Sequence, residues 1–268
     1  MRANDIRSFD PYRYGAYICL SVPASSAAAA ASADVPALAE RLGLVNEYDS
    51  AGTDPPQSIA YLRRVSAVPG QVTDAGLLSA EALVHVAAPA QEPITEFRAG
   101  LASLLGPAVT TRVLAGAVRP LSYTGFAMFN YSYAQRILQQ PASLTPNAFI
   151  VPVSKTADWW QKDWMERHTY FLPRYDDTGK MQNQGHALAA APGIPCLLRR
   201  TYQSLAQPAA DGDFDFVSYF ECADADVPVF YDVCDALRDV TRNPEWEFVR
   251  EGPTWHGRRI ATWAGLFS

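Results

Sequence analysis

The sequence contains little cysteine and little histidine, and neither is clustered. Among 268 residues there are 4 Cys and 4 His. The cysteines form no CxxC pair, and no histidine lies at zinc-ligand spacing from any of them, which argues against a structural zinc site. The four are Cys19, Cys196, Cys222 and Cys234. Three of them lie in apolar runs, where reduced buried thiols are expected, and this usage fits a reducing cytoplasm.

The sequence also lacks a long apolar run and an excess of positive charge. No stretch reaches the roughly 18 apolar residues that a membrane span needs, so we expect no membrane partner. The net charge is -6, and no basic face is visible, so we expect no nucleic-acid partner. The residues before the first apolar run include Asp5 and Asp10, unlike the short basic start of a signal peptide. We therefore expect a cytoplasmic protein.

Several common cofactor and catalytic motifs are missing as well. The chain has no GxGxxG, no GxxxxGK[ST] and no GxSxG, which disfavours a nucleotide cofactor and a serine nucleophile. It is rich in apolar residues (49%) and aromatic residues (12%). This composition can build a large core and leaves enough flat apolar side chains to line a planar ligand.

Hydrophobic periodicity predicts strands that alternate with helices in both halves of the chain. The alanine-rich stretch after the first strand is predicted to be a flexible loop. In the first half we expect strands at Tyr14–Val22, Leu83–Ala88 and Arg112–Tyr123, and helices at Val35–Leu44 and Ile94–Leu105. In the second half we expect strands at Phe149–Val153, Leu197–Leu205 and Phe214–Glu221, helices at Ala157–Arg167 and Val227–Val240, a loop at Thr169–Gln184 and an extended segment at Glu247–Ile260.

This repeated alternation, with mainly antiparallel strands, predicts an α+β fold rather than a doubly wound parallel sheet. The two similar halves suggest an internal duplication. We expect one domain over residues 10–140 and a second over residues 141–268.

His186 and Arg199 are the most informative pair of residues. A short segment that carries the histidine leads into a predicted strand that begins with two arginines. A histidine and a guanidinium on successive elements could lie on either side of one flat cofactor. A heme oxidoreductase needs this arrangement, with a neutral imidazole on iron and a fixed cation over the open face.

The second half resembles the chlorite dismutase family of heme proteins. The pieces that carry the resemblance are FIVPVSKTADWW (Phe149–Trp160), the thirteen-residue offset from His186 to Arg199, RRTYQS (Arg199–Ser204), DFDFVSYFE (Asp213–Glu221) and GPTWHG. Their order and this offset give the match its specificity. The first half resembles the family only in its ferredoxin-like pattern.

The resemblance implies two ferredoxin-like domains with antiparallel sheets, a dimeric α+β barrel, in a homo-oligomer that binds heme b. It implies that His186 is the proximal iron ligand, with His168 as a rival ligand because ERHT also resembles the sequence around the family's histidine. Arg199 resembles the distal catalytic arginine. Lys155, Trp159 and Trp160 resemble residues that line the proximal side and the edge of the heme.

Three departures from the family pattern bear on the reaction. Arg242 aligns where the family has a glutamate that bonds the proximal histidine, although Glu245 could substitute after a small shift. LAQPAADGD (Leu205–Asp213) replaces a tight turn and remodels the pocket rim. Val151 stands where the coproheme decarboxylase branch has a tyrosine. This disfavours decarboxylation, although a tyrosine from elsewhere, such as Tyr131, Tyr133 or Tyr175, stays possible.

The sequence therefore predicts a heme-dependent oxidoreductase that activates a small oxidant, chlorite or peroxide, at a His-ligated iron beneath Arg199. One alternative is a heme enzyme of the same fold that acts on a small organic substrate in biosynthesis. Others are a non-catalytic heme-binding or heme-transfer protein, and a ferredoxin-like dimer that has lost heme.

Overall fold

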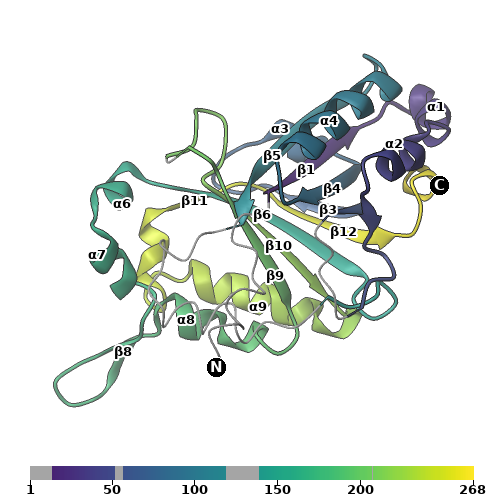
Figure 1. Ribbon diagram of the computed structural model, residues 1–268. Coiled ribbons are helices and arrows are strands. Elements are labelled where there is room, and N and C mark those ends of the chain that lie inside the picture. The colour runs from purple at the N-terminus through teal and green to yellow at the C-terminus, as the bar shows by residue number, and fades with distance from the viewer. Residues whose placement is uncertain (1–13, 52–56, 119–138, 207) are drawn as a thin grey trace.

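The computed structural model describes residues 14–51, 57–118, 139–206 and 208–268. Nearly all strands of this part belong to one antiparallel sheet (Figure 1). The fold is α+β with antiparallel strands, as the sequence predicts. Within the same residues, no helix has the length and apolar character needed to cross a membrane.

The first half contributes four strands in the order β5–β1–β4–β3. Apolar alternation and β-branched residues favour an extended chain in each of them. Their bounds are β1 Tyr14–Ser21, β3 Ser58–Val68, β4 Ala82–Ala88 and β5 Thr110–Val118. A two-residue strand, β2 (Val45–Asn46), pairs in parallel with β3. The predicted strand Arg112–Tyr123 is confirmed up to Val118, and its remainder lies outside the described residues.

The second half repeats this arrangement in the order β12–β6–β10–β9. Its strands are β6 Asn147–Lys155, β9 Leu198–Gln203, β10 Phe216–Cys222 and β12 Thr254–Ile260, and the short β11 (Val249–Glu251) pairs with β6. Numbered along each half, the main strands lie in the order fourth, first, third, second in both. This common order supports an internal duplication.

The two groups of four strands close into a barrel. β5 pairs with β9 through Ala117 and Gln203, and β3 pairs with β12 over most of its length. Closure leaves these strands no free edge, and side chains fill the interior. The buried interior includes Tyr17, Leu62, Leu83, Leu114, Tyr202, Tyr219 and Trp255.

Buried ion pairs inside the barrel join its parts. Arg200 of β9 donates from Nη1 to Glu47 Oε2 at 2.8 Å, which links the second half to the first. Arg259 of β12 lies 3.0 Å from Glu221 Oε2 of β10. All four side chains are buried, so each charge depends on its partner for compensation.

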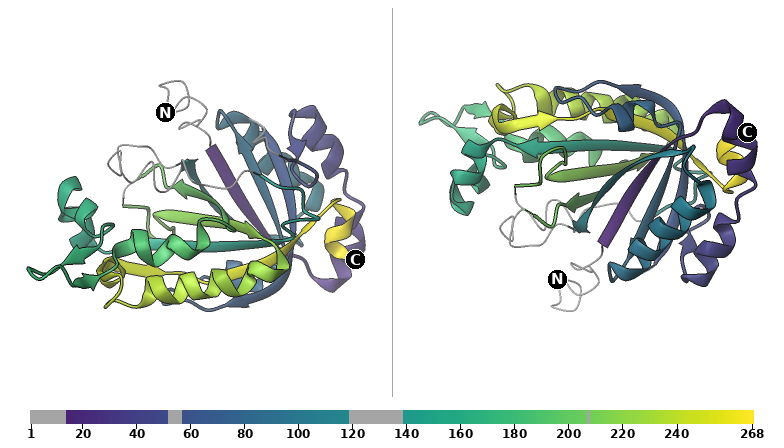
Figure 2. Two further views of the ribbon diagram at one scale, coloured as in Figure 1. Left: turned by 90° about the horizontal axis from the view of Figure 1, so that it is seen from below. Right: turned by 90° about the horizontal axis from the view of Figure 1, so that it is seen from above.

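Helices cover the outer faces of the strands (Figure 2). In the first half these are α1 Ala27–Ala31, α2 Val35–Arg41 and α4 Glu92–Leu105. Leu77 of α3 (Ala75–Ser79) packs instead with the residues of the barrel interior. Phe97 and Leu101 of α4 pack in one core with the outward residues of β1 and β4. In the second half, α8 (Gly185–Ala190) and α9 (Val227–Arg238) lie over β6, β9 and β10.

Two local predictions were wrong. The alanine-rich stretch is a 3-10 turn (Ala24–Ser26) followed by α1, held in place because Trp263 Nε1 donates to the carbonyl of Ala30 at 2.7 Å. The predicted helix Ala157–Arg167 is two helices, α6 (Ala157–Gln161) and α7 (Trp164–Thr169). Asp163 accepts from the backbone N–H of Glu166 and so starts a new helix there.

The predicted loop Thr169–Gln184 contains a short hairpin of β7 (Arg174–Tyr175) and β8 (Met181–Asn183). The hairpin and α7 project to one side of the barrel (Figure 1). The remaining short 3-10 segments are Ala191–Gly193, Asp224–Asp226, Pro244–Phe248 and Ala264–Phe267.

Candidate functional site

A cavity lies in the second half, between the outer face of the barrel and the helices α8 and α9. Alternate residues of three strands form one wall, as expected where successive side chains point to opposite faces. This wall contains Val151, Val153, Arg199, Thr201, Phe216, Ser218 and Phe220. The other walls include His186, Ala190, Phe230, Val233, Cys234, Leu237 and Trp246. Most of the lining is apolar, so the few polar groups define its chemistry.

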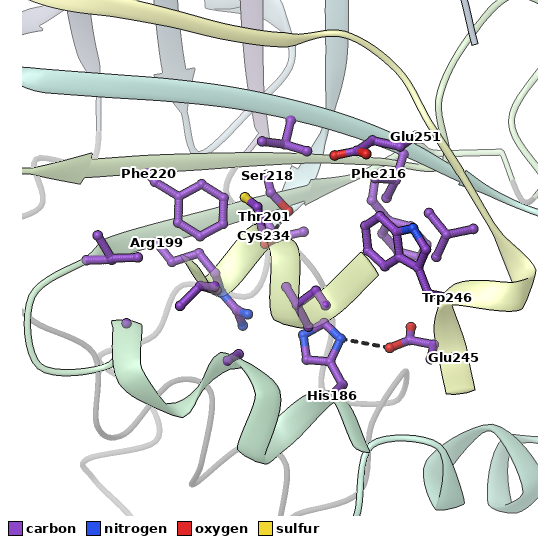
Figure 3. Close-up of a pocket in the computed structure, with 18 of the residues that line it drawn as sticks. His186, Arg199, Thr201, Phe216, Ser218, Phe220, Cys234, Glu245, Trp246 and Glu251 are labelled. Atoms are coloured by element: carbon purple, nitrogen blue, oxygen red, sulfur yellow. Dashed lines mark hydrogen bonds and ion pairs between the residues drawn. The ribbon is translucent and has the colours of Figure 1, made fainter. Parts of the chain in front are cut away.

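The sequence at the start of α8 fixes the position of His186. Gly185 has φ +63°, and a Cβ there would lie 2.4 Å from the carbonyl oxygen of Leu172. Glycine therefore allows both the turn and the close approach. The His186 N–H donates to the carbonyl of Tyr170, and its ring lies 5.2 Å from that of Phe171. The imidazole projects into the cavity (Figure 3).

Glu245 orients this imidazole. His186 Nδ1 lies 2.7 Å from Glu245 Oε2, and the other oxygen, Oε1, lies 2.5 Å from Lys155 Nζ. Glu245 sits on the 3-10 segment Pro244–Phe248 and is 4% exposed. Burial opposes its ionisation, but the charge of Lys155 and the hydrogen bonds from Lys155 and His186 outweigh that effect and lower the pKa of Glu245. The carboxylate therefore stays ionised between its two partners.

Of the two candidates for the partner of His186, the structure shows Glu245, which required a small shift of the alignment, and not Arg242. Arg242 Nε donates to Gln184 Oε1 at 3.1 Å, and its backbone carbonyl accepts from the N–H groups of Gln184 and Gly185. It thus holds the start of α8 and does not contact the imidazole. The shift of three residues arises because the chain enters a 3-10 segment at Pro244, which turns Glu245 inward.

The hydrogen bond to Glu245 also determines what His186 can do. An ionised carboxylate can only accept, so Nδ1 carries the hydrogen and Nε2 carries the lone pair. Within the described chain, Nε2 has no hydrogen-bond partner. A neutral imidazole in this tautomer can bind a metal ion through Nε2.

Arg199 lies on the opposite wall. It comes from β9, and its guanidinium extends into the cavity toward His186 (Figure 3). The next residue, Arg200, points to the other face of the strand, where it bonds Glu47 and Gln139 inside the barrel. The double arginine of the sequence therefore supplies one cation to the cavity and one to the barrel interior.

The other residues singled out in the sequence have different positions. Lys155 lines the cavity, but its ammonium is bound to Glu245 and lies 4.3 Å from the ring centre of Trp159. Trp159 is fully buried in a neighbouring cluster with Phe171. Trp160 donates from Nε1 to Asp215 Oδ2 at 3.3 Å. His168 lies on α7. The two tryptophans and His168 are not among the residues that line the cavity.

Of the three tyrosines considered for decarboxylation, one lies within the described residues. Val151 lines the cavity, as expected from its alignment. Tyr175 lies on the projecting hairpin and is 55% exposed. Tyr131 and Tyr133 lie outside the described residues.

Sequence reasoning missed several polar lining residues. Thr201, Ser218, Cys234 and Glu251 all line the cavity, and Glu251 accepts two hydrogen bonds from Arg238 of α9. The alternation along β10 could have identified Ser218, because it shares a face with Phe216 and Phe220. Nothing in the sequence distinguished Cys234 from an ordinary core cysteine.

Known structures provide an independent comparison. A mutant chlorite dismutase from Candidatus Nitrospira defluvii, with arginine replaced by glutamate, superposes with a TM-score of 0.67 at 19% identity, over 96% of this chain and 94% of that chain. The chain has the fold of chlorite dismutase. A complex of a chlorite dismutase from the same organism with imidazole matches with a TM-score of 0.64 at 18% identity, over 99% and 98%. A tryptophan-to-phenylalanine mutant with cyanide matches at 0.65 and 17%, over 100% and 98%.

These matches cover 96–100% of this chain, so the likeness in fold includes the first half, where the sequence offered only a pattern. No family model matches the sequence, and a search of the curated proteins found no match either. The similarity therefore lies in the arrangement of the backbone.

Proposed function

We propose that this protein is a heme-dependent oxidoreductase that activates a small oxidant, chlorite or a peroxide, between His186 and Arg199. The observation that carries the proposal is the pairing of His186 Nδ1 with Glu245 Oε2 at 2.7 Å on one wall of the cavity, opposite the guanidinium of Arg199. This pairing leaves the lone pair of Nε2 available to bind iron.

The side chains that line the cavity support the assignment of a heme. Its walls are mainly aliphatic and aromatic, with Phe171, Phe216, Phe220, Phe230 and Trp246 among the lining residues, which suits a flat apolar macrocycle. A neutral histidine whose second nitrogen donates to a carboxylate is a common axial ligand for heme iron. We propose heme b, with His186 as the proximal ligand and His168 without a role at the iron.

When bound, the heme would supply the redox chemistry, with an open iron position for the oxidant. The residues of this chain would control that position. Glu245 would keep the imidazole oriented and electron-rich. Arg199, which stays charged at any working pH, would draw in an anion or a polar oxidant and hold it near the iron. The apolar side chains around it would exclude bulk water.

The similar structures support the proposal. The chlorite dismutases with this fold include complexes with cyanide and with imidazole, both of which bind iron. Val151, in place of a phenol on the cavity wall, argues against decarboxylation of coproheme. A non-catalytic heme carrier would not need a guanidinium that extends toward His186.

The experiment that tests the proposal has two stages. Purified protein is first titrated with hemin and followed by its Soret band. The loaded protein is then mixed with chlorite in an oxygen electrode and, separately, with hydrogen peroxide and a reducing dye. We expect turnover of at least one oxidant, and a loss of about a hundredfold in Arg199→Ala. Heme binding without turnover of either oxidant would favour the heme carrier.

A further inference from the structure

Two hydroxyl groups form a pair on the cavity wall that also carries Arg199. Thr201 of β9 and Ser218 of β10 are direct partners in the antiparallel register. Both side chains line the cavity, and their oxygen atoms lie 3.4 Å apart. The pair is surrounded by apolar lining residues, including Val153, Phe216 and Phe220.

The pair has hydrogen-bonding capacity that the protein does not use. Each hydroxyl carries one hydrogen and two lone pairs. One hydroxyl donates its hydrogen to the oxygen of the other, and the hydrogen of that second hydroxyl has no protein acceptor in the described chain. The contact of 3.4 Å is also much longer than the usual O–H···O distance of about 2.7–2.8 Å, so it is weak and readily replaced. The pair can therefore present an O–H donor to a ligand in the cavity.

The position of the pair relative to Arg199 suggests how such a ligand lies. Arg199 and Thr201 are two residues apart on one face of β9, a rise of about 6.6 Å along the strand. Both belong to the wall opposite His186. A small ligand on that wall thus meets two kinds of donor, a guanidinium and a hydroxyl.

We propose that the Thr201–Ser218 pair is a second substrate-positioning element, so that the cavity selects small ligands with two oxygen atoms. One oxygen is held by Arg199 and the other by the hydroxyl pair. This inference rests on the proposed function, because it assigns the pair a role toward a ligand of the heme. Hydroperoxides and oxyanions such as chlorite share the required chemistry, whereas a single-atom ligand has no second atom to place at the hydroxyl pair.

The direct test is ligand binding to the ferric, heme-loaded protein. The probes are nitrite, which has two oxygen atoms, and fluoride, which is a single atom; each is titrated by its effect on the heme spectrum. Removal of both hydroxyls in the double variant Thr201→Val/Ser218→Ala should weaken nitrite about tenfold, the effect of losing one hydrogen bond to an anion. Thr201→Val and Ser218→Ala alone should each weaken nitrite by less, because one hydroxyl remains as a donor. Fluoride affinity should change by less than about twofold.

A conservative variant separates positioning from packing. Thr201→Ser keeps the hydroxyl and removes a methyl group, so it should bind nitrite as the unmodified protein does. Thr201→Val keeps the shape and removes the hydroxyl. Far-ultraviolet circular dichroism and an unchanged Soret band show which variants are folded and loaded. If the double variant does not fold, the test is whether the two single variants bind nitrite more weakly than Thr201→Ser does.

Steady-state kinetics then distinguish the two sources of the ligand. A rise in KM for chlorite in the double variant identifies an oxyanion, a rise for hydrogen peroxide identifies a hydroperoxide, and a rise for both supports the shared chemistry. Equal nitrite affinity in the unmodified protein and the double variant overturns the role of the pair but leaves the proposed function intact. A protein that takes up no heme overturns the proposed function, and this inference falls with it.

Discussion

Glu245 bonds His186 through one carboxylate oxygen and Lys155 through the other, at 2.7 Å and 2.5 Å. The three residues come from separate elements: a 3-10 segment, α8 and β6. A single buried carboxylate thus fixes the imidazole to the sheet, and this places His186 opposite Arg199.

The orienting role of Glu245 can be measured through cofactor affinity. Glu245→Gln keeps the shape of the side chain but replaces a charged acceptor with a neutral one. We expect heme affinity to fall about 10- to 100-fold, the usual effect of removing a residue that orients a metal ligand. Hemin titration measures it. Glu247→Gln, on an exposed position of the same 3-10 segment, is the matched control. Equal affinity in Glu245→Gln and the control would contradict the orienting role.

The same carboxylate makes stability depend on pH. The pKa of Glu245 is lowered in the folded protein, so the unfolded chain binds more protons as the pH falls. The stabilising contribution is therefore complete above the unfolded pKa of about 4.3 and is lost as the pH decreases from there toward the folded value. We expect urea denaturation to show a steeper loss of stability between pH 6 and pH 3 in the unmodified protein than in Glu245→Gln. If stability fell with pH to the same extent in both proteins, ionisation of Glu245 would not contribute to the stability of the fold.

Replacement of the two consecutive arginines should destabilise the protein to different extents. Arg200→Leu leaves Glu47 charged and buried inside the barrel, which should reduce the free energy of unfolding by about 3–5 kcal/mol. Arg199→Leu removes a cavity side chain and should cost less than about 1 kcal/mol. Urea denaturation of both variants at pH 7 checks the difference. The assignment of the two faces of β9 would be wrong if Arg199→Leu were the more destabilised protein.

The cysteines should differ in reactivity. Burial raises the pKa of Cys19, Cys222 and Cys234 to about 12, so few thiolates exist at neutral pH. Cys196 is only partly buried, and its pKa is raised chiefly by partial burial. We expect one thiol to react with an aromatic disulfide reagent at pH 8 well before the other three. The fast phase should be absent in Cys196→Ser, and its persistence there would contradict the order of burial.

Much of the fold was accessible from the sequence because its signals are local. Apolar alternation located β1, β4, β6, β9 and β10, and the apolar periodicity from Val227 located α9. The closure of the barrel was not accessible, because the pairing of β5 with β9 and of β3 with β12 joins residues far apart in the chain. β3 itself was missed, although it is the longest strand among the described residues.

The candidate site shows the same contrast between local signals and contacts of residues far apart in the chain. The offset between His186 and Arg199 was readable because only a short helix and a 3-10 turn separate them. The sequence did not decide between Arg242 and Glu245 as the partner of His186, because the chain turns before Glu245 and shifts the alignment by three residues. The hydroxyl pair of Thr201 and Ser218 depends on the cross-strand register, which a single sequence does not specify.

The identity of the axial ligand is the central claim, and one spectroscopic comparison tests it. His186→Ala and His168→Ala are prepared in parallel and titrated with hemin under the same conditions. We predict that His168→Ala develops the same Soret band as the unmodified protein and that His186→Ala does not develop it. A normal Soret band in His186→Ala together with its loss in His168→Ala would contradict the account.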